Sequence, residues 1–112
     1  HIFPQSSNDI PYWKKNFKTK DSSIYLNSLG NLLLLSRNKN SSLSNKSFEE
    51  KKNGELSYKT GSQSEIEVAF NSDWTKETIV ERGKKMLGFL QERWGVTLNE
   101  EQIEKLLTNK IK

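Results

Sequence analysis

The sequence has 112 residues, and its 18 Lys and Arg against 14 Asp and Glu give a formal charge of +4 at pH 7. A chain this short forms one small domain. Its lack of cysteine excludes a disulfide scaffold, a cysteine-ligated zinc site and a thiol nucleophile. The longest apolar run, residues 32–35, is far shorter than the roughly 20 residues that span a bilayer, and no signal segment opens the chain, so we expect a cytoplasmic protein without a membrane segment.

The N-terminal residues predict short elements separated by polar loops. Residues 1–3 resemble the end of a strand that Pro4 closes, and residues 5–21 are polar and lysine-rich, as in a loop with one or two helical turns. Residues 24–30 predict a short helical turn that ends at a glycine. Because the sequence starts at a histidine and not at a methionine, we expect a fragment truncated at its N-terminus.

The middle of the sequence predicts a buried strand followed by a helix. Residues 31–36 form an apolar run bounded by turn-forming residues, which is typical of a buried strand. Residues 41–52 predict a helix with one apolar and one basic face. The side chains expected to point inward are Leu43 and Phe48, and those expected to point outward are Lys46, Lys51 and Lys52.

The C-terminal half predicts two amphipathic helices, after a loop over 53–64 and a segment over 65–70 that fits either a helix or a strand. The first helix covers 76–94, with Thr75 as its N-cap and Gly95 at its end, and the second covers 100–110. Asn99 and Gln102 would form the capping box of the second helix. The apolar face of the first would consist of Ile79, Gly83, Met86, Leu87, Leu90 and Trp94.

Positive charge is concentrated in the first half of the chain. Residues 1–52 carry a formal charge of +5, whereas residues 53–112 carry −1. A basic half beside a nearly neutral half is expected where one face meets phosphate groups. A lysine-rich solvated surface would give the same count, so charge alone supports both interpretations equally.

Three polar side chains, His1, Asn31 and Asn40, could surround one groove if a strand end, a buried strand and a helix start lie together. Hydrolysis of a phosphodiester needs a general base of near-neutral pKa and a divalent cation on the scissile phosphate. Histidine supplies such a base, and an amide oxygen is an acceptable ligand for Mg²⁺. Taken singly, the three residues have simpler interpretations as a surface histidine, a turn asparagine and a helix N-cap.

The residues at 1–6 (HIFPQS), those at 29–32 (LGNL) and Asn40 together resemble the HNH nucleases, also called His-Me finger or ββα-metal nucleases. Within that superfamily, residues 29–36, 40–45 and 48–51 are similar to the C-terminal domain of GmrSD-type modification-dependent restriction endonucleases. The resemblance is strong over 1–52 and weaker over 58–94, where Trp74, Ile79 and Arg82 fit the distal pattern of that family. The nine-residue step from Asn31 to Asn40 also matches the HNH domain of RNA-guided nucleases.

The resemblance implies a role for each of the three polar residues. His1 would be the general base, Asn31 would orient it through hydrogen bonding, and Asn40 would ligate Mg²⁺ or Mn²⁺. The family has an acidic residue or a histidine directly before the catalytic histidine as its first metal ligand, and that position would precede residue 1.

The resemblance also implies a fold and a function. We expect one α+β domain over 1–112, with a ββα-metal core over 1–52 and a helical extension over 53–112. Its activity would be metal-dependent DNA endonuclease activity in a modification-dependent restriction or phage-defence system. An upstream nucleotide-hydrolysing domain, in the same or a partner chain, would recognise the target.

Seven basic residues are candidates for contact with DNA: Lys14, Lys15, Lys18, Lys46, Lys51, Lys52 and Arg82. The simpler interpretation is a solvated lysine surface, with Arg82 paired to Glu77 or Glu81 on its own helix. The three tryptophans, Trp13, Trp74 and Trp94, are more typical of a core than of a base-stacking platform. Two other functions fit the same residues: a non-catalytic nucleic-acid-binding or assembly module with this fold, and an RNase.

Overall fold

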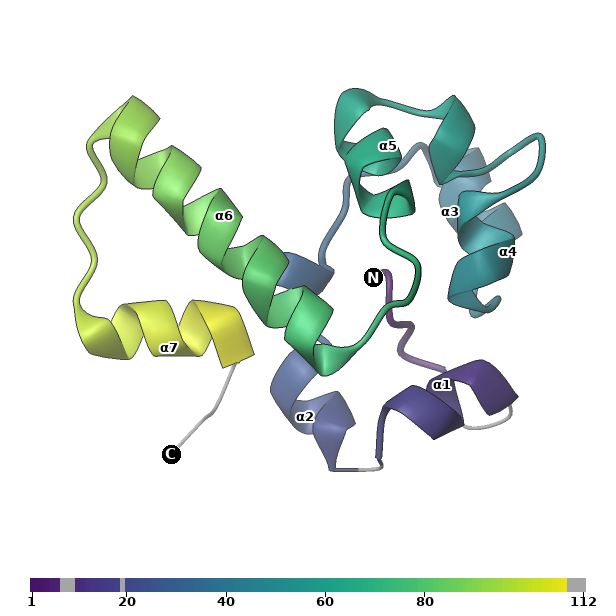
Figure 1. Ribbon diagram of the computed structural model, residues 1–112, viewed down its shortest axis with the longest axis horizontal. Helices are drawn as coiled ribbons and strands as arrows, with labels where there is room; N and C mark the ends of the chain where they lie inside the picture. The colour runs from purple at the N-terminus through teal and green to yellow at the C-terminus, as the bar shows by residue number, and fades with distance from the viewer. Residues whose placement is uncertain (7–9, 19, 109–112) are drawn as a thin grey trace.

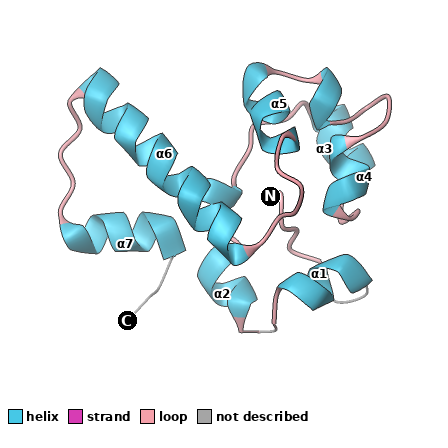
Figure 2. Ribbon diagram, in the orientation of Figure 1, coloured by secondary structure: helices cyan, strands magenta, loops and turns pink. Residues whose placement is uncertain are grey.

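The computed structural model describes residues 1–6, 10–18 and 20–108, and every regular element in these ranges is a helix (Figures 1 and 2). The long helix over residues 76–94 runs from the upper left to the centre of the view, with the helix over 100–108 below it on the left (Figure 1). The helices over 37–69 lie to its right, and those over 11–16 and 21–25 lie below (Figure 1). The α-helices are α1 (Pro11–Asn16), α2 (Asp21–Tyr25), α3 (Arg37–Leu43), α4 (Phe48–Lys52), α5 (Gln63–Ala69), α6 (Lys76–Trp94) and α7 (Glu100–Thr108). Two 3-10 turns, η1 (Leu29–Asn31) and η2 (Tyr58–Thr60), complete the order.

The expected α+β fold with a ββα-metal core is wrong, because the described residues contain no strand. The two segments predicted as strands, 1–3 and 31–36, are joined by one backbone hydrogen bond, from Ile2 N to Asn31 O at 2.9 Å. A sheet needs a ladder of such bonds and usually three or more strands. The leucine run over residues 32–35 is also not buried as a core strand would be, since Leu34 is 94% exposed.

The helix predicted over 41–52 is two helices, α3 and α4, that meet at a turn. Ser44 ends α3 with a φ of 41°, a conformation that a continuing helix cannot adopt. Ser47 then starts α4 with a capping box, in which its side chain accepts from Glu50 N and the Glu50 carboxylate accepts from Ser47 N. Ser36 caps α3, so that Asn40 lies inside this helix and is not its N-cap. The predicted start at residue 41 is four residues too late, because the interpretation of Asn40 as the N-cap gives Asn40 the position that Ser36 holds.

The two amphipathic helices predicted for the C-terminal half are confirmed, whereas the loop predicted over 53–64 contains η2 and the first two residues of α5. Helix α6 has the predicted bounds, its N-cap Thr75 accepts a bond from Thr78 N, and Gly95 ends it in the left-handed conformation with a φ of 63°. Asn99 and Gln102 exchange the two hydrogen bonds of a capping box at the start of α7. Residues 109–110, predicted to extend this helix, lie outside the described residues. The ambiguous segment 65–70 lies largely in α5.

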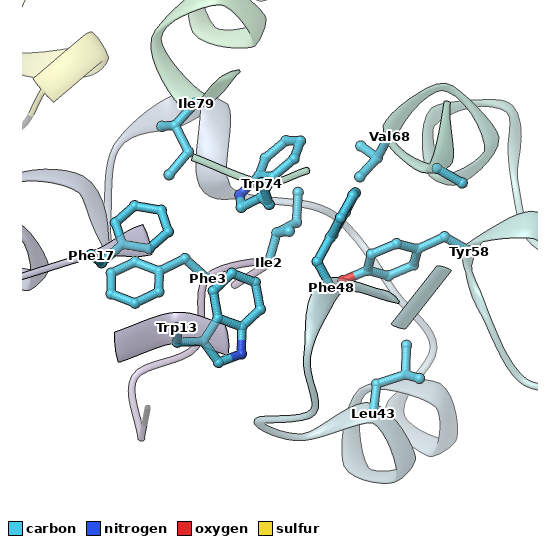
Figure 3. Packing of buried hydrophobic residues seen from close by; sticks show 11 residues of the cluster. Ile2, Phe3, Trp13, Phe17, Leu43, Phe48, Tyr58, Val68, Trp74 and Ile79 are labelled. Carbon is cyan, nitrogen blue, oxygen red and sulfur yellow. The ribbon is translucent and has the colours of Figure 1, made fainter. Parts of the chain in front are cut away.

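The core forms where α1, α4 and α5 meet the extended N-terminal segment (Figure 3). Phe3 stacks on Phe17 with ring centroids 3.9 Å apart, and Phe48 lies 5.3 Å from Trp74. Trp13 and Trp74 are fully buried, as predicted, whereas Trp94 at the end of α6 is 68% exposed and does not belong to the core. The cluster consists of Ile2, Phe3, Trp13, Phe17, Leu43, Phe48, Tyr58, Val68, Ala69, Trp74 and Ile79.

Helix α6 packs directly against the turn η1 through two glycines. A Cβ atom on Gly30 would overlap the carbonyl oxygen of Ile79 and would lie 2.8 Å from Gly83 N. Gly83 is in turn covered by Leu107 of α7. This close approach positions the next residue, Asn31, beneath the start of α6. None of the helices in the described part of the chain is both long and apolar enough to cross a membrane.

Candidate active site

His1 lies on the surface, and the two residues that follow it anchor the segment in the core. Ile2 and Phe3 are 0% and 1% exposed, so the backbone enters the core directly after the exposed imidazole. The ring nitrogen Nε2 of His1 lies 2.8 Å from Oδ1 of Asn27, an exposed residue in the turn between α2 and η1. An amide oxygen accepts only, so this contact requires the proton on Nε2, and in the neutral imidazole the lone pair is then on Nδ1.

Asn31 is the polar residue that fixes the N-terminal segment from below. It is completely buried, and its Oδ1 accepts from Phe3 N at 2.7 Å and from Trp74 Nε1 at 3.0 Å. Its Nδ2 donates to Phe3 O at 2.9 Å and to Leu26 O at 2.8 Å. These four bonds use the two acceptor and two donor positions of the side-chain amide.

The geometry of Asn31 differs from the role that the resemblance implied. With all four positions occupied, its amide contacts the backbone two residues after His1, whereas the imidazole is contacted by Asn27. Asn31 can therefore influence His1 only through the course of the backbone. That Asn31 orients a catalytic base stays a prediction, and the orientation would have to act through the backbone of residues 1–3.

Lys51 was predicted to point outward, and this orientation is wrong. Its side chain is 1% exposed and donates from Nζ to Ile2 O at 2.8 Å and to His1 O at 3.3 Å. The ammonium also lies 5.7 Å from the centre of the Trp13 ring. Burial lowers the pKa of the Lys51 ammonium from its ordinary value to about 8. A lysine in this position cannot reach a phosphate group without leaving the core.

Asn40 lies on the exposed face of α3, where its amide oxygen is accessible to a hydrated ion. Within ranges 1–6, 10–18 and 20–108 there is no group of three or more His, Asp or Glu side chains that could enclose a metal. Mg²⁺ commonly retains several of its waters and takes one or two protein ligands together with substrate phosphates. The donor set thus fits an ion held by one amide oxygen, water and substrate, and it does not fit a closed metal centre.

Of the other predicted DNA contacts, two are bonded to backbone carbonyl groups of the protein and four are exposed. Arg82 is half-buried, and its Nη1 donates to Gly30 O at 2.9 Å and to Leu32 O at 2.7 Å, which fastens η1 to α6. Burial lowers the pKa of this guanidinium, which nevertheless stays protonated. Lys52 is half-buried and donates to Asn71 O at 3.0 Å. The remaining candidates, Lys14, Lys15, Lys18 and Lys46, are exposed.

A groove of about 1060 Å³ lies between α5 and α6, and it does not coincide with the predicted site. Its wall combines apolar side chains, such as Phe70, Met86 and Phe89, with charged side chains of both signs, which are Glu67, Glu77, Glu81, Arg82 and Lys85. None of His1, Asn31 and Asn40 lines it. Arg82, one of the predicted DNA contacts, does line it, but its Nη1 donates to Gly30 O and Leu32 O. The three carboxylates of the wall outnumber its two cations, which is unfavourable for a phosphate backbone.

Sequence reasoning missed two residues of this site. Asn27, which contacts the imidazole, stands in a turn between two short helical segments and matches no motif. Trp74 was noted for its place in a family pattern, but its bond to Asn31 joins residues 43 positions apart and could not be inferred from spacing. The buried position of Lys51 could not be predicted either, because its bonds go to residues 49 and 50 positions away. In the sequence, Lys51 and Lys52 together are typical of a solvated helix face.

Residues 1–89 match the family model of the C-terminal domain of GmrSD restriction endonucleases, which covers well over half of the chain. The protein is thus related to restriction endonucleases. More narrowly, the chain belongs to the family of GmrSD C-terminal domains, as its sequence resemblance indicated. The match ends within α6 and therefore leaves α7 outside the family region. Comparisons with curated proteins and with solved structures found no match.

Proposed function

We propose that this domain is a metal-dependent endonuclease domain that hydrolyses phosphodiester bonds in DNA as part of a modification-dependent restriction system. Membership of a restriction endonuclease family supports the reaction class. The observation that carries the proposal is the setting of His1, the single histidine of the chain. Its imidazole is exposed to substrate and water, while the residues that follow it are fixed in the core by Asn31.

In this proposal His1 acts as the general base. With Nε2 bonded to Asn27, the free lone pair on Nδ1 takes a proton from water. The resulting hydroxide attacks the phosphorus atom in line with the bond to the 3′ oxygen, which breaks as the new bond forms. The leaving oxygen then takes up a proton from solvent. Asn27 keeps the ring in the tautomer that this step requires.

Asn40 would hold the divalent cation, Mg²⁺ or Mn²⁺. When bound, the ion would neutralise charge on the scissile phosphate and stabilise the leaving 3′ oxygen. Because an amide oxygen is neutral and Asn40 is exposed, we expect weak binding in the absence of DNA and tighter binding once a phosphate group completes the ligand set.

The DNA backbone would lie against the exposed lysines of the first half of the chain. Lys14 and Lys15 are in the last turn of α1, and Lys18 follows two residues beyond its end. Their charges would contribute to affinity without reading sequence. Recognition of the modified target would then fall to an upstream nucleotide-hydrolysing domain, in the same or a partner chain.

Cleavage of plasmid DNA by the full-length protein tests the proposal. His1→Ala should lower the cleavage rate by 10²–10⁴-fold, the range typical of a general base, while leaving DNA binding intact. A loss of only about 10-fold would contradict the role of His1. Binding of DNA without any cleavage by the wild type would instead support a non-catalytic module, and cleavage confined to RNA would support an RNase.

The metal assignment needs a separate experiment with a matched control. Asn40→Ala should abolish cleavage at Mg²⁺ concentrations that saturate the wild type, whereas Asn38→Ala, also on the exposed side of α3, should not. Asn40→Asp adds a negative charge to the ligand and should lower the metal concentration needed for half-maximal cleavage. Identical metal dependence in the wild type and both Asn40 variants would refute the assignment.

A further inference from the structure

The backbone groups of the extended segment 1–3 form most of their hydrogen bonds with side chains, where a strand would form them with a neighbouring strand. On one side, Asn31 bonds to both the N–H and the C=O of Phe3, and its own backbone oxygen accepts from Ile2 N. The carbonyl oxygens of His1 and Ile2 remain, and both accept from Lys51 Nζ. A buried carbonyl without a donor is costly, so these contacts explain how a lone extended segment stays in the core.

The ammonium of Lys51 is buried at a cost, and what it contacts there is the backbone of His1 and Ile2. The ammonium is buried, and no carboxylate in the described ranges lies within ion-pair distance of it. Burying an unpaired charge is unfavourable, and burial lowers the pKa of Lys51 accordingly. An apolar side chain of similar length would avoid that cost but would leave the two carbonyl groups without a donor.

We propose that Lys51 is a positioning residue of the candidate active site, which holds the backbone of His1 and Ile2 and thereby fixes the exposed imidazole. The inference rests on the proposed function of His1 as the base. Lys51 reaches the segment from α4, whereas Asn31 reaches it from η1. Contact from both sides prevents the backbone from rotating, and an error of about 1 Å in the position of a catalytic group can cost about 100-fold in rate.

The test compares Lys51→Met with Lys59→Met, which removes an exposed lysine on η2, and with Lys51→Arg, which restores donors. Since the chain has a single histidine, its Cε1–H resonance can be assigned without ambiguity. In Lys51→Met this resonance should move toward that of an unstructured histidine, and the cleavage kcat should fall about 100-fold with KM for DNA unchanged. Lys51→Arg should recover a part of both, and Lys59→Met should match the wild type.

Several outcomes would overturn the inference. Lys51→Met could fold with an unchanged His1 resonance and an unchanged kcat, or it could raise KM alone, which would indicate a role in DNA binding. If Lys51→Met does not fold, the histidine resonance of Lys51→Arg decides. The inference requires it to lie closer to the wild-type position than to that of an unstructured histidine, and a resonance at the unstructured position overturns it. Should the wild type prove inactive, the proposed nuclease function fails by itself, while the resonance still shows whether Lys51 positions His1.

Discussion

Replacement of Asn31 by alanine tests whether one buried amide organises the N-terminal segment. The substitution leaves four groups without their partner, namely the N–H and C=O of Phe3, the C=O of Leu26 and the indole N–H of Trp74. At a net value of about 1 kcal/mol per hydrogen bond, the free energy of unfolding should fall by about 4 kcal/mol. That is a large part of the 5–15 kcal/mol that stabilises a typical domain, as an order-of-magnitude estimate.

Urea unfolding followed by tryptophan fluorescence and far-UV circular dichroism measures this loss. For a chain of this size, about 4 kcal/mol corresponds to a fall of about 15 °C in Tm. Asn31→Asp keeps the shape of the side chain but directs an acceptor at the oxygens of Phe3 and Leu26, so it should also be strongly destabilising. Asn38→Ala, at an exposed position, should change the stability by less than about 0.5 kcal/mol. A loss of under about 1 kcal/mol in Asn31→Ala would refute the reasoning.

Three further predictions concern packing, titration and charge. Gly30→Ala should destabilise the fold by about 3 kcal/mol, because its Cβ would meet the backbone of α6. Gly88→Ala, with open space around its Cβ, should stabilise α6 by about 0.5–1 kcal/mol. Thermal unfolding compares the two variants, and equal effects would contradict the close contact at Gly30. Since the pKa of Lys51 is lowered to about 8 in the folded state, the unfolded state binds more protons between pH 8 and 10.5, and the stability of the wild type relative to Lys51→Met should rise over this range by up to about 3 kcal/mol. Urea unfolding at several pH values measures that difference, and a flat difference would mean that Lys51 is not buried as a charge. In filter binding, removal of three exposed lysines should reduce the slope of log K against log salt by about 0.9 per lost phosphate contact, and an unchanged slope would place the DNA elsewhere. The lysines are Lys14, Lys15 and Lys18.

The sequence by itself determined the elements whose signals are local. Helix α6 could be predicted with its bounds because Thr75 and Gly95 act on the backbone within one turn of themselves. The family could also be recognised, because the motif around residues 1–6 and 29–36 is carried by residue identity and spacing. Helical caps and motifs of this kind need no knowledge of the rest of the chain.

Only the tertiary structure decided what the two apolar segments near the motif become. Apolar segments such as 1–3 and 31–36 fit strands, but a strand exists only where a partner offers a ladder of backbone bonds. These two segments share one backbone bond, and the other partners of segment 1–3 are the side chains of Asn31 and Lys51. The same long-range contacts decided that Lys51 lies fully inside, with its Nζ on the carbonyl group of Ile2, and that Lys52 is half-buried, with its Nζ on the carbonyl group of Asn71. Both are lysines at the end of one short helix. Burial of a charge depends on which carbonyl groups the fold brings to it, and that information is not local to the sequence.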